Sequence, residues 1–97
     1  MKELEITDNE FLRQFEVRID GKLAKIEYAT QEKKVFLTKL IIPEELEKDD
    51  FKDRFIEAVL HEIDGRNLRV VPTSPEIASF LRANKQYKEL LPAGIRI

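Results

Sequence analysis

The residues that could carry chemistry gather at one corner of the chain, where an apolar segment ends at Pro43 and an acidic segment follows. In a small α/β domain, a strand end followed by a helix start suits a phosphate-bearing ligand, because N–H groups at a helix start bind anions. Here carboxylates would repel a polyanion, and they lack the spacing of a calcium loop. The sequence therefore favours a solvated, acidic helix start, formed by Glu44, Glu45, Glu47, Lys48, Asp49 and Asp50.

Few other side chains offer reactive groups. The chain has no cysteine, which excludes a disulfide scaffold, a thiolate zinc site and a cysteine nucleophile. His61 is the only histidine, and its place near the border of a predicted polar helix face favours a surface role over that of a general base. Ser74 stands directly before Pro75, which favours a helix cap over a nucleophile. We therefore assign no catalytic residue and no metal site.

Composition indicates one globular domain over residues 1–97. Hydrophobic residues make up 42% of the chain and charged residues 37%, and the formal net charge of −2 argues against a nucleic-acid partner. No apolar run approaches the roughly 20 residues that span a bilayer, so we expect no membrane partner. The acidic amino end predicts no signal peptide, and we expect a cytoplasmic protein.

Alternating residues predict an antiparallel hairpin in the first third of the chain. Phe15, Val17 and Ile19 fall on one face of a strand. The Asp20-Gly21 pair follows at once, and it is a strong turn signal because both of its residues need a positive φ. A second alternating strand from Ala24 to Tyr28 completes the hairpin.

A third strand is predicted from Val35 to Ile42. It is nearly apolar throughout, which predicts that both of its faces are covered. Pro43 ends it, because proline lacks the N–H group that a sheet ladder needs. The start of the chain is predicted to be weakly structured, with a short strand around Leu4 to Ile6.

Apolar residues recurring every four positions predict a helix from about Asp50 to Asp64. We expect Asp50 to cap its start and Gly65 to end it in the left-handed conformation. The apolar residues of this helix are Phe51, Phe55, Val59 and Ile63.

The remainder of the chain predicts one more strand and two shorter helices. Because a helix precedes it, the strand Leu68 to Val71 should lie parallel to the third strand. A helix with Ile77, Phe80 and Leu81 on its inner side follows, and a short helix from Lys85 to Leu91 ends the fold. The predicted fold class is α/β (α+β), with the order β-β-β-α-β-α and a mixed four-stranded sheet.

The order and spacing of particular residues then suggest a family. They are Phe15-Glu16, Asp20-Gly21, Ala24, Tyr28, Leu37, Pro43, Leu60, Val70-Val71-Pro72, Phe80-Leu81, Tyr87 and Leu90. This set resembles the smallest single-domain branch of the GNAT superfamily of acetyl-CoA-dependent N-acetyltransferases, and the resemblance covers about residues 13–91. It implies a minimal GNAT-like fold, acetyl-CoA as the cofactor and an amine as the acceptor.

The chain departs from that family where the resemblance places the coenzyme. Lys39 to Pro43 replaces a His-Thr-Glu-Val-Pro run, and only the proline matches. Lys48 to Lys52 replaces Gly-x-Gly-Ile-Ala, whose N–H groups cradle the pyrophosphate. Pro72-Thr73-Ser74 replaces Pro-x-Cys, and Asn84 to Tyr87 replaces His-Pro-Glu-Tyr. By position alone, the resemblance implies a coenzyme-binding set of Leu40, Ile41, Ile42, Lys48, Asp50, Phe51 and Ser74.

Three hypotheses follow. The first is a GNAT-like protein with weakened or lost acetyl-CoA binding, acting as a small interaction module. The second is an active N-acetyltransferase on a divergent scaffold, in which the backbone of Leu40 to Ile42 holds the acyl thioester, since direct transfer needs positioning more than a nucleophile. The third is an unrelated module that assembles through a sheet edge or an apolar patch. The partner is an acceptor amine or a protein, and we expect a monomer or weak homodimer.

Overall fold

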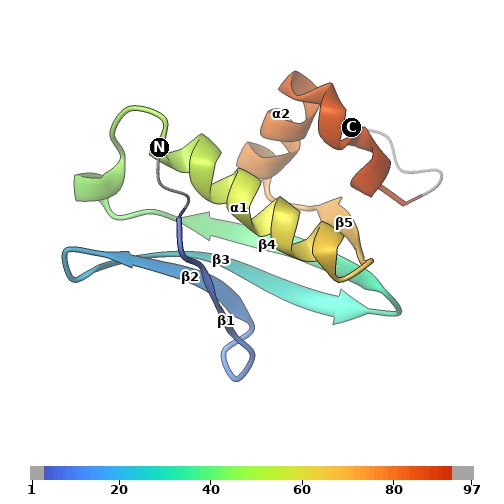
Figure 1. Cartoon of the computed structure of the whole chain (residues 1–97), viewed down its shortest axis with the longest axis horizontal. Helices are drawn as coiled ribbons and strands as arrows, with labels where there is room; N and C mark the ends of the chain where they lie inside the picture. Colours follow the sequence, from blue (N-terminus) through green and yellow to red (C-terminus); the bar gives the residue numbers. More distant parts are fainter. Residues whose placement is uncertain (1–3, 93–97) are drawn as a thin grey trace.

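The structure, a computed structural model, describes residues 4–92. Strands and helices follow the predicted order, with one additional strand at the start and a 3-10 helix after β4 (Figure 1). The strands are β1 (Thr7–Asn9), β2 (Gln14–Ile19), β3 (Lys22–Gln31), β4 (Lys34–Ile41) and β5 (Arg69–Pro72). The helices are α1 (Phe51–Gly65) and α2 (Pro75–Ala83), with 3-10 helices η1 (Glu44–Leu46) and η2 (Lys85–Leu90).

The sheet has five strands in the order β1-β2-β3-β4-β5, so the prediction of four strands was one short. All pairs are antiparallel except β4 and β5, which are parallel as predicted. The turn between β2 and β3 has φ values of 51° at Asp20 and 76° at Gly21, which confirms the predicted hairpin. The strand that was missed, β1, lies just after the predicted Leu4–Ile6 segment. It is a polar edge strand, and its side chains give no alternating pattern.

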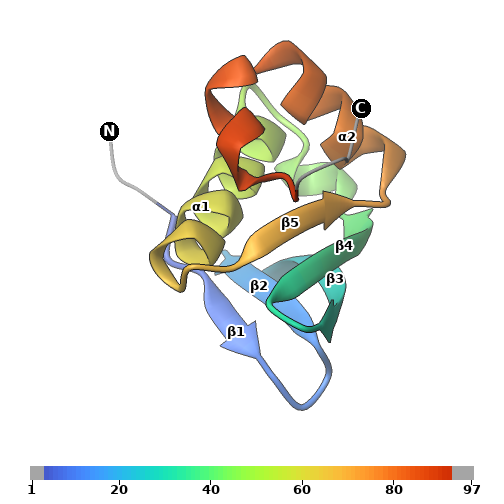
Figure 2. The ribbon, with the colours of Figure 1, turned by 90° about the vertical axis from the view of Figure 1, so that its right-hand side faces the viewer.

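Both α-helices lie on one face of the sheet (Figures 1 and 2). Along β4, Val35 and Leu37 are buried while Phe36 is partly exposed and Thr38 is exposed. The prediction that both faces of this strand are covered was therefore wrong. The apolar run arises because the outer face of β4 also carries apolar residues such as Phe36, although no helix among residues 4–92 covers that face.

Helix α1 packs its apolar stripe onto the sheet as predicted. Ile56 and Leu60 widen that stripe, and both are fully buried with Phe55, Val59 and Ile63. Burial of each such side chain stabilises the fold by about 1.5–3 kcal/mol relative to leaving it exposed. One apolar core thus joins α1, α2 and the inner face of the sheet.

The two ends of α1 differ from the prediction. Asp50 occupies the N-cap position but makes no side-chain capping bond. Gly65 is the last helical residue, and the left-handed residue is Asn67, with φ 59°. The N–H of Leu68 donates to the carbonyl of Ile63 at 3.2 Å, which closes the helix in a Schellman-like manner two residues later than predicted.

Candidate functional site

Strands β4 and β5 part at the point where α2 begins. Their parallel pairing ends at the Leu37–Pro72 pair, and β4 then continues to Ile41. The carbonyl of Leu37 accepts hydrogen bonds from the backbone N–H groups of Thr73 and Ser74, at 3.1 and 2.9 Å. The Thr73 hydroxyl donates to the same carbonyl at 3.0 Å. These bonds fix the start of α2 against the middle of β4.

Beyond Leu37, one edge of β4 has no strand partner within residues 4–92. Thr38 is an extra residue opposite the Glu27–Tyr28 step of β3, where the register shifts, and its hydroxyl donates to the Glu27 carbonyl at 3.1 Å. The following residues of β4 pair with β3 on one side only. We refer to the β5-facing side of residues 38–41 as the open edge.

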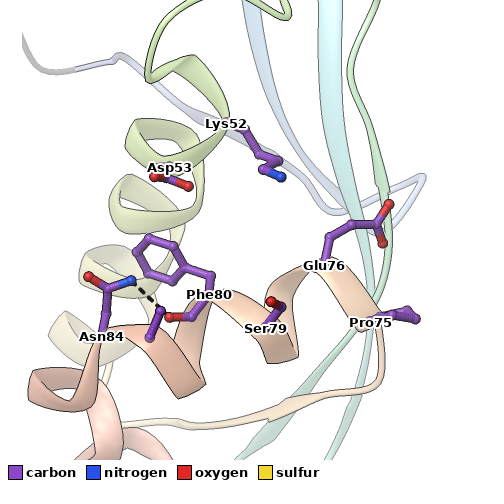
Figure 3. A pocket seen from close by; sticks show the side chains of 8 residues that line it. Lys52, Asp53, Pro75, Glu76, Ser79, Phe80 and Asn84 are labelled. Atoms are coloured by element: carbon purple, nitrogen blue, oxygen red, sulfur yellow. Dashed lines mark hydrogen bonds between the residues drawn. The ribbon is translucent and has the colours of Figure 1, made fainter.

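A cavity of about 410 Å³ lies between the first turn of α1 and α2 (Figure 3). Figure 3 shows the Phe80 ring lying between the two helices and the Lys52 ammonium on the side of Glu76. Asn84 donates a hydrogen bond from Nδ2 to the Phe80 carbonyl at 2.8 Å, which holds the end of α2 in place. The residues that give the cavity its chemical character are Lys52, Asp53, Glu76, Ser79, Phe80 and Asn84.

The acidic loop, residues 43–50, connects β4 to α1. Three of its seven N–H groups, and the first N–H of α1, donate hydrogen bonds within this segment, because the chain folds back on itself in η1 and in the turn that follows. These donors and their carbonyl acceptors are Leu46 to Pro43 (2.9 Å), Glu47 to Glu44 (3.1 Å), Lys48 to Leu46 (2.8 Å) and Phe51 to Lys48 (3.1 Å). Asp49 has φ 52°, a conformation that glycine adopts freely and that aspartate tolerates. The loop N–H groups left over, at Glu44, Glu45, Asp49 and Asp50, all belong to residues with a carboxylate side chain.

The residues predicted to bind the coenzyme are distributed over three environments. Lys48 and Asp50 are exposed on the acidic loop, whereas Phe51 belongs to the core and is 7% exposed. Leu40 and Ile42 pack against the core, and Ile41 is partly exposed. None of these residues lines the cavity.

Ser74, the last residue of that predicted set, is 1% exposed. It stands at the N-cap position of α2 with Pro75 at the first helical position, as predicted. Its hydroxyl donates to the Glu76 carboxylate at 3.1 Å instead of accepting a backbone N–H. Since the hydroxyl is buried and its hydrogen bond joins the first turn of α2, the position is suited to packing.

Sequence reasoning missed the cavity residues, although a signal for some of them is present. Glu76, Ser79, Phe80 and Ala83 recur at spacings of three and four, so they share one face of a helix. Lys52 and Asp53 directly follow Phe51, which belongs to the predicted coenzyme-binding set. Phe80 was predicted only as a core residue, and the structure shows that it also forms a cavity wall.

Tyr87 forms a cluster with two residues of α1. Its hydroxyl donates to Glu57 Oε2 at 3.0 Å and lies 3.4 Å from His61 Nε2. Partial burial, and then the Glu57 carboxylate, raise the pKa of Tyr87 to about 12. A phenol with that pKa remains protonated near neutrality, and its ring packs against Phe80 with centroids 5.9 Å apart. The cluster therefore connects η2 to α1 and offers no ready proton.

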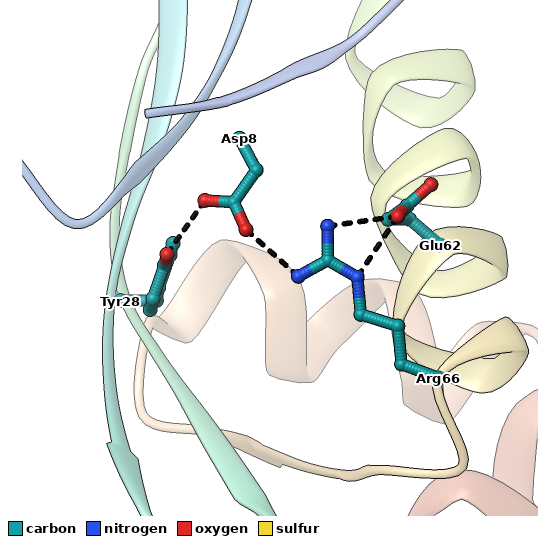
Figure 4. Close-up of polar contacts among 4 residues, drawn as sticks. All are labelled: Asp8, Tyr28, Glu62 and Arg66. Atoms are coloured by element: carbon teal, nitrogen blue, oxygen red, sulfur yellow. Dashed lines mark hydrogen bonds and ion pairs between the residues drawn. The ribbon is translucent and has the colours of Figure 1, made fainter. Parts of the chain in front are cut away.

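A second polar cluster, the clasp, ties the end of α1 to the sheet (Figure 4). Asp8 accepts hydrogen bonds from the Tyr28 hydroxyl at 2.6 Å and from Arg66 Nη1 at 2.7 Å. Arg66 also pairs with Glu62, at 2.8 Å from Nη2 and 2.9 Å from Nε. Burial, and then the bond to Asp8, raise the pKa of Tyr28 to about 12. The clasp consists of Asp8, Tyr28, Glu62 and Arg66, and all its charges are paired.

Comparisons with known proteins decide the family. The chain matches the family described as "GCN5-related N-acetyl-transferase" over residues 14–90. It belongs to this GNAT family. The fold agrees with the solution structure of a "GCN5-like putative N-acetyltransferase" from Staphylococcus aureus, with a TM-score of 0.72 and 20% sequence identity. That match covers 99% of this chain and 94% of the other. No curated protein matches the chain.

GNAT proteins generally bind acetyl-CoA, and the resemblance of the sequence to that family places the pyrophosphate at the acidic loop. The loop does not fit that group. Its N–H groups at Leu46, Glu47 and Lys48 donate within the loop, and Asp49 and Asp50 add negative charge. Residues 4–92 contain no cluster of three or more His, Cys, Asp or Glu side chains that could hold a metal ion. No helix in this range is long and apolar enough to cross a membrane.

Proposed function

We propose that this GNAT-family chain has a weakened or lost acetyl-CoA site and acts as a small non-catalytic binding module. The observation that carries the proposal is the combination of internal hydrogen bonds and exposed carboxylates in the acidic loop. Pyrophosphate binding at a helix start needs free N–H groups and an uncancelled positive helix dipole. Three of the loop's N–H groups already donate within the loop, the others belong to acidic residues, and the exposed carboxylates oppose a polyanion.

The charge around the start of α1 supports this proposal. Between Glu44 and Asp53 the chain carries six carboxylates and two lysines. Within the described part of the chain, Glu45 is the only one of these carboxylates in an ion pair, with Lys22 at 3.7 Å. The others keep their charge available to repel phosphate groups, and they interact favourably with the α1 dipole.

The test is a titration of acetyl-CoA into the protein, followed by backbone amide NMR. We expect no saturable shifts at millimolar ligand, because three loop amides are already bonded and carboxylates beside the remaining ones repel the pyrophosphate. Saturable shifts confined to residues 40–55 would show that the coenzyme site is intact, and the proposal would then be wrong. A GNAT protein with an intact glycine loop serves as the positive control under the same conditions.

An active N-acetyltransferase is the second candidate, because strands β4 and β5 part beside a cavity. Direct acetyl transfer needs the thioester and the amine to be held close together, and it needs no dedicated nucleophile. An assay of free coenzyme A release, with acetyl-CoA and a panel of primary amines, separates the two candidates. Release that depends on both protein and amine would favour the enzyme.

A further inference from the structure

The open edge of β4 and the acidic loop lie next to each other in the chain and in the fold. The open edge comprises residues 38–41, and the acidic loop begins two residues later at Pro43. An unpaired strand edge presents a row of N–H and C=O groups that can pair with another extended chain. Extended peptides bind many domains by adding a strand to such an edge.

The open edge is accessible. Thr38 and Lys39 are exposed, and Ile41 is partly exposed. Within residues 4–92, no backbone hydrogen bond outside the strand pairing involves residues 38–41. The neighbouring η1 does not close this edge, because its Glu45 is tied to Lys22 at the start of β3, on the opposite side of β4.

Charge then selects the kind of chain that the edge would accept. Glu44, Glu47, Asp49 and Asp50 are exposed and form no ion pair within the described residues. They extend directly from the carboxyl end of β4, so an added strand would run past them. Lysine or arginine side chains of that strand would meet these carboxylates, whereas acidic side chains would be repelled.

We propose that the open edge binds an extended segment of a partner protein that carries basic side chains. The backbone of the segment pairs with residues 38–41, and its basic side chains lie against the acidic loop. The proposal rests on the proposed function above, since a module that does not hold acetyl-CoA keeps this edge free.

The first experiment uses three capped octapeptides against the full chain, followed by amide NMR and calorimetry. The probe alternates lysine and threonine, the second peptide alternates glutamate and threonine, and the third is the lysine peptide N-methylated at every second residue. We expect saturable shifts for the lysine peptide at residues 38–50 and none for the glutamate peptide. Removing about two backbone hydrogen bonds by N-methylation should weaken binding roughly tenfold or more.

Two double variants test the charge argument. Asp49→Asn with Asp50→Asn removes two carboxylates and keeps side chains that suit the observed backbone, so binding should weaken about fivefold. The matched control is Glu10→Gln with Glu32→Gln, two exposed carboxylates in distant turns, for which we expect no change. If both variants weakened peptide binding equally, the effect would come from net charge alone, and the assignment of the acidic loop as the binding surface would be wrong.

Other outcomes are equally decisive. Unchanged affinity for the N-methylated peptide, or shifts away from residues 38–50, would exclude strand addition. Concentration-dependent dimerisation in sedimentation, with protection of the same residues, would assign the edge to a second copy. Acetyl-CoA titrated into the same sample separates the two proposals. If neither ligand binds, only this inference fails, and if acetyl-CoA binds at the acidic loop, the proposed function fails.

Discussion

The two ends of helix α1 are built in opposite ways. At its C-terminal end, the clasp pairs every charge, since Arg66 bonds to both Asp8 and Glu62. At its N-terminal end, Asp50 makes no capping bond, and Asp49 and Asp50 form no ion pair within residues 4–92. One end therefore holds the fold together, and the other leaves its charges available to a ligand.

The comparison shows that one helix start cannot be stabilised by its own carboxylates and also bind a pyrophosphate well. Carboxylates in the first turn, such as Asp53, stabilise α1 through its dipole by about 0.3–1 kcal/mol each. A bound pyrophosphate would use the same dipole and the same N–H groups. In this chain the dipole is matched by its own acidic residues, so the helix gains stability where a coenzyme would otherwise bind.

Breaking the clasp should have the largest effect on stability. Asp8→Ala removes a carboxylate whose side chain is only 11% exposed, and it leaves the Tyr28 hydroxyl and Arg66 without that partner. We expect the free energy of unfolding to fall by about 2–3 kcal/mol. Urea denaturation followed by circular dichroism measures it. The control Asp50→Ala, at the other end of α1, should change it by less than about 1 kcal/mol, and equal losses would show that the ends do not differ.

Placing glycine in the acidic loop tests whether the side chains of this loop prevent coenzyme binding. Lys48→Gly with Asp50→Gly returns the residues that the resemblance places beside the pyrophosphate and removes one carboxylate. If the loop chemistry limits binding, affinity for acetyl-CoA should rise by about tenfold or more, which equals 1.4 kcal/mol. Amide NMR titration measures the change.

The matched control for that variant is Glu32→Gly with Lys33→Gly. Both residues have φ 50° in the turn between β3 and β4, so glycine fits the backbone there without strain. This control should leave coenzyme affinity unchanged. A gain in both variants would point to a general effect of glycine on the chain and would contradict the role given to the acidic loop.

Removing a single hydroxyl from the clasp should have a smaller effect than removing its central carboxylate. Tyr28→Phe keeps the ring that packs against Phe15, with centroids 4.8 Å apart, and loses only the bond to Asp8. We expect a loss of about 1 kcal/mol in the free energy of unfolding. The double variant with Asp8→Ala tests the pairing, since its loss should be less than the sum of the two single losses.

Alkaline titration should show both tyrosines resisting ionisation. They are the only tyrosines in the chain, and partial burial is the first cause that raises the pKa of each from 10.0 to about 12. Because the folded state favours the neutral phenol, this contribution to stability is complete below pH 10 and is lost as pH rises towards 12. Tyrosinate absorbance measured on folded and urea-unfolded protein should differ accordingly, and coincident curves would contradict the two hydrogen bonds.

Most of the architecture could be predicted from the sequence, because it depends on local patterns. The Asp20-Gly21 turn and the spacing of Phe55 and Val59 are signals that neighbouring residues carry by themselves. Strand β1 could not be found in this way, because its Thr-Asp-Asn sequence has no apolar alternation and its pairing uses side chains such as Asn9, which donates to Glu16 at 2.9 Å. The clasp was missed for the same reason, since Asp8 and Arg66 are 58 residues apart.

The candidate site was less predictable than the fold. The acidic loop was predicted correctly as a run of exposed charge. Pro43 allowed a helical turn at this point, but the N–H groups that η1 uses become visible only in the fold. The cavity depends on the relative placement of α1 and α2, and hence on the whole core. The open edge exists because the pairing of β5 with β4 ends at Pro72, and this end becomes visible only once the two strands are paired.

The smallest expected change in stability concerns the C-terminal end of α1, where the predicted and the observed left-handed residues differ. Gly65 is helical, and an added Cβ would meet nothing within 4 Å, so Gly65→Ala should stabilise the protein by about 0.5 kcal/mol through helix propensity. Gly21→Ala is the matched control, because φ 76° at that turn strains any side chain, and it should destabilise by about 1 kcal/mol. Thermal and urea unfolding of both variants measure the signs. Destabilisation by Gly65→Ala would mean that Gly65, and not Asn67, takes the left-handed conformation, and the turn leading to Arg66 and the clasp would then need a different geometry.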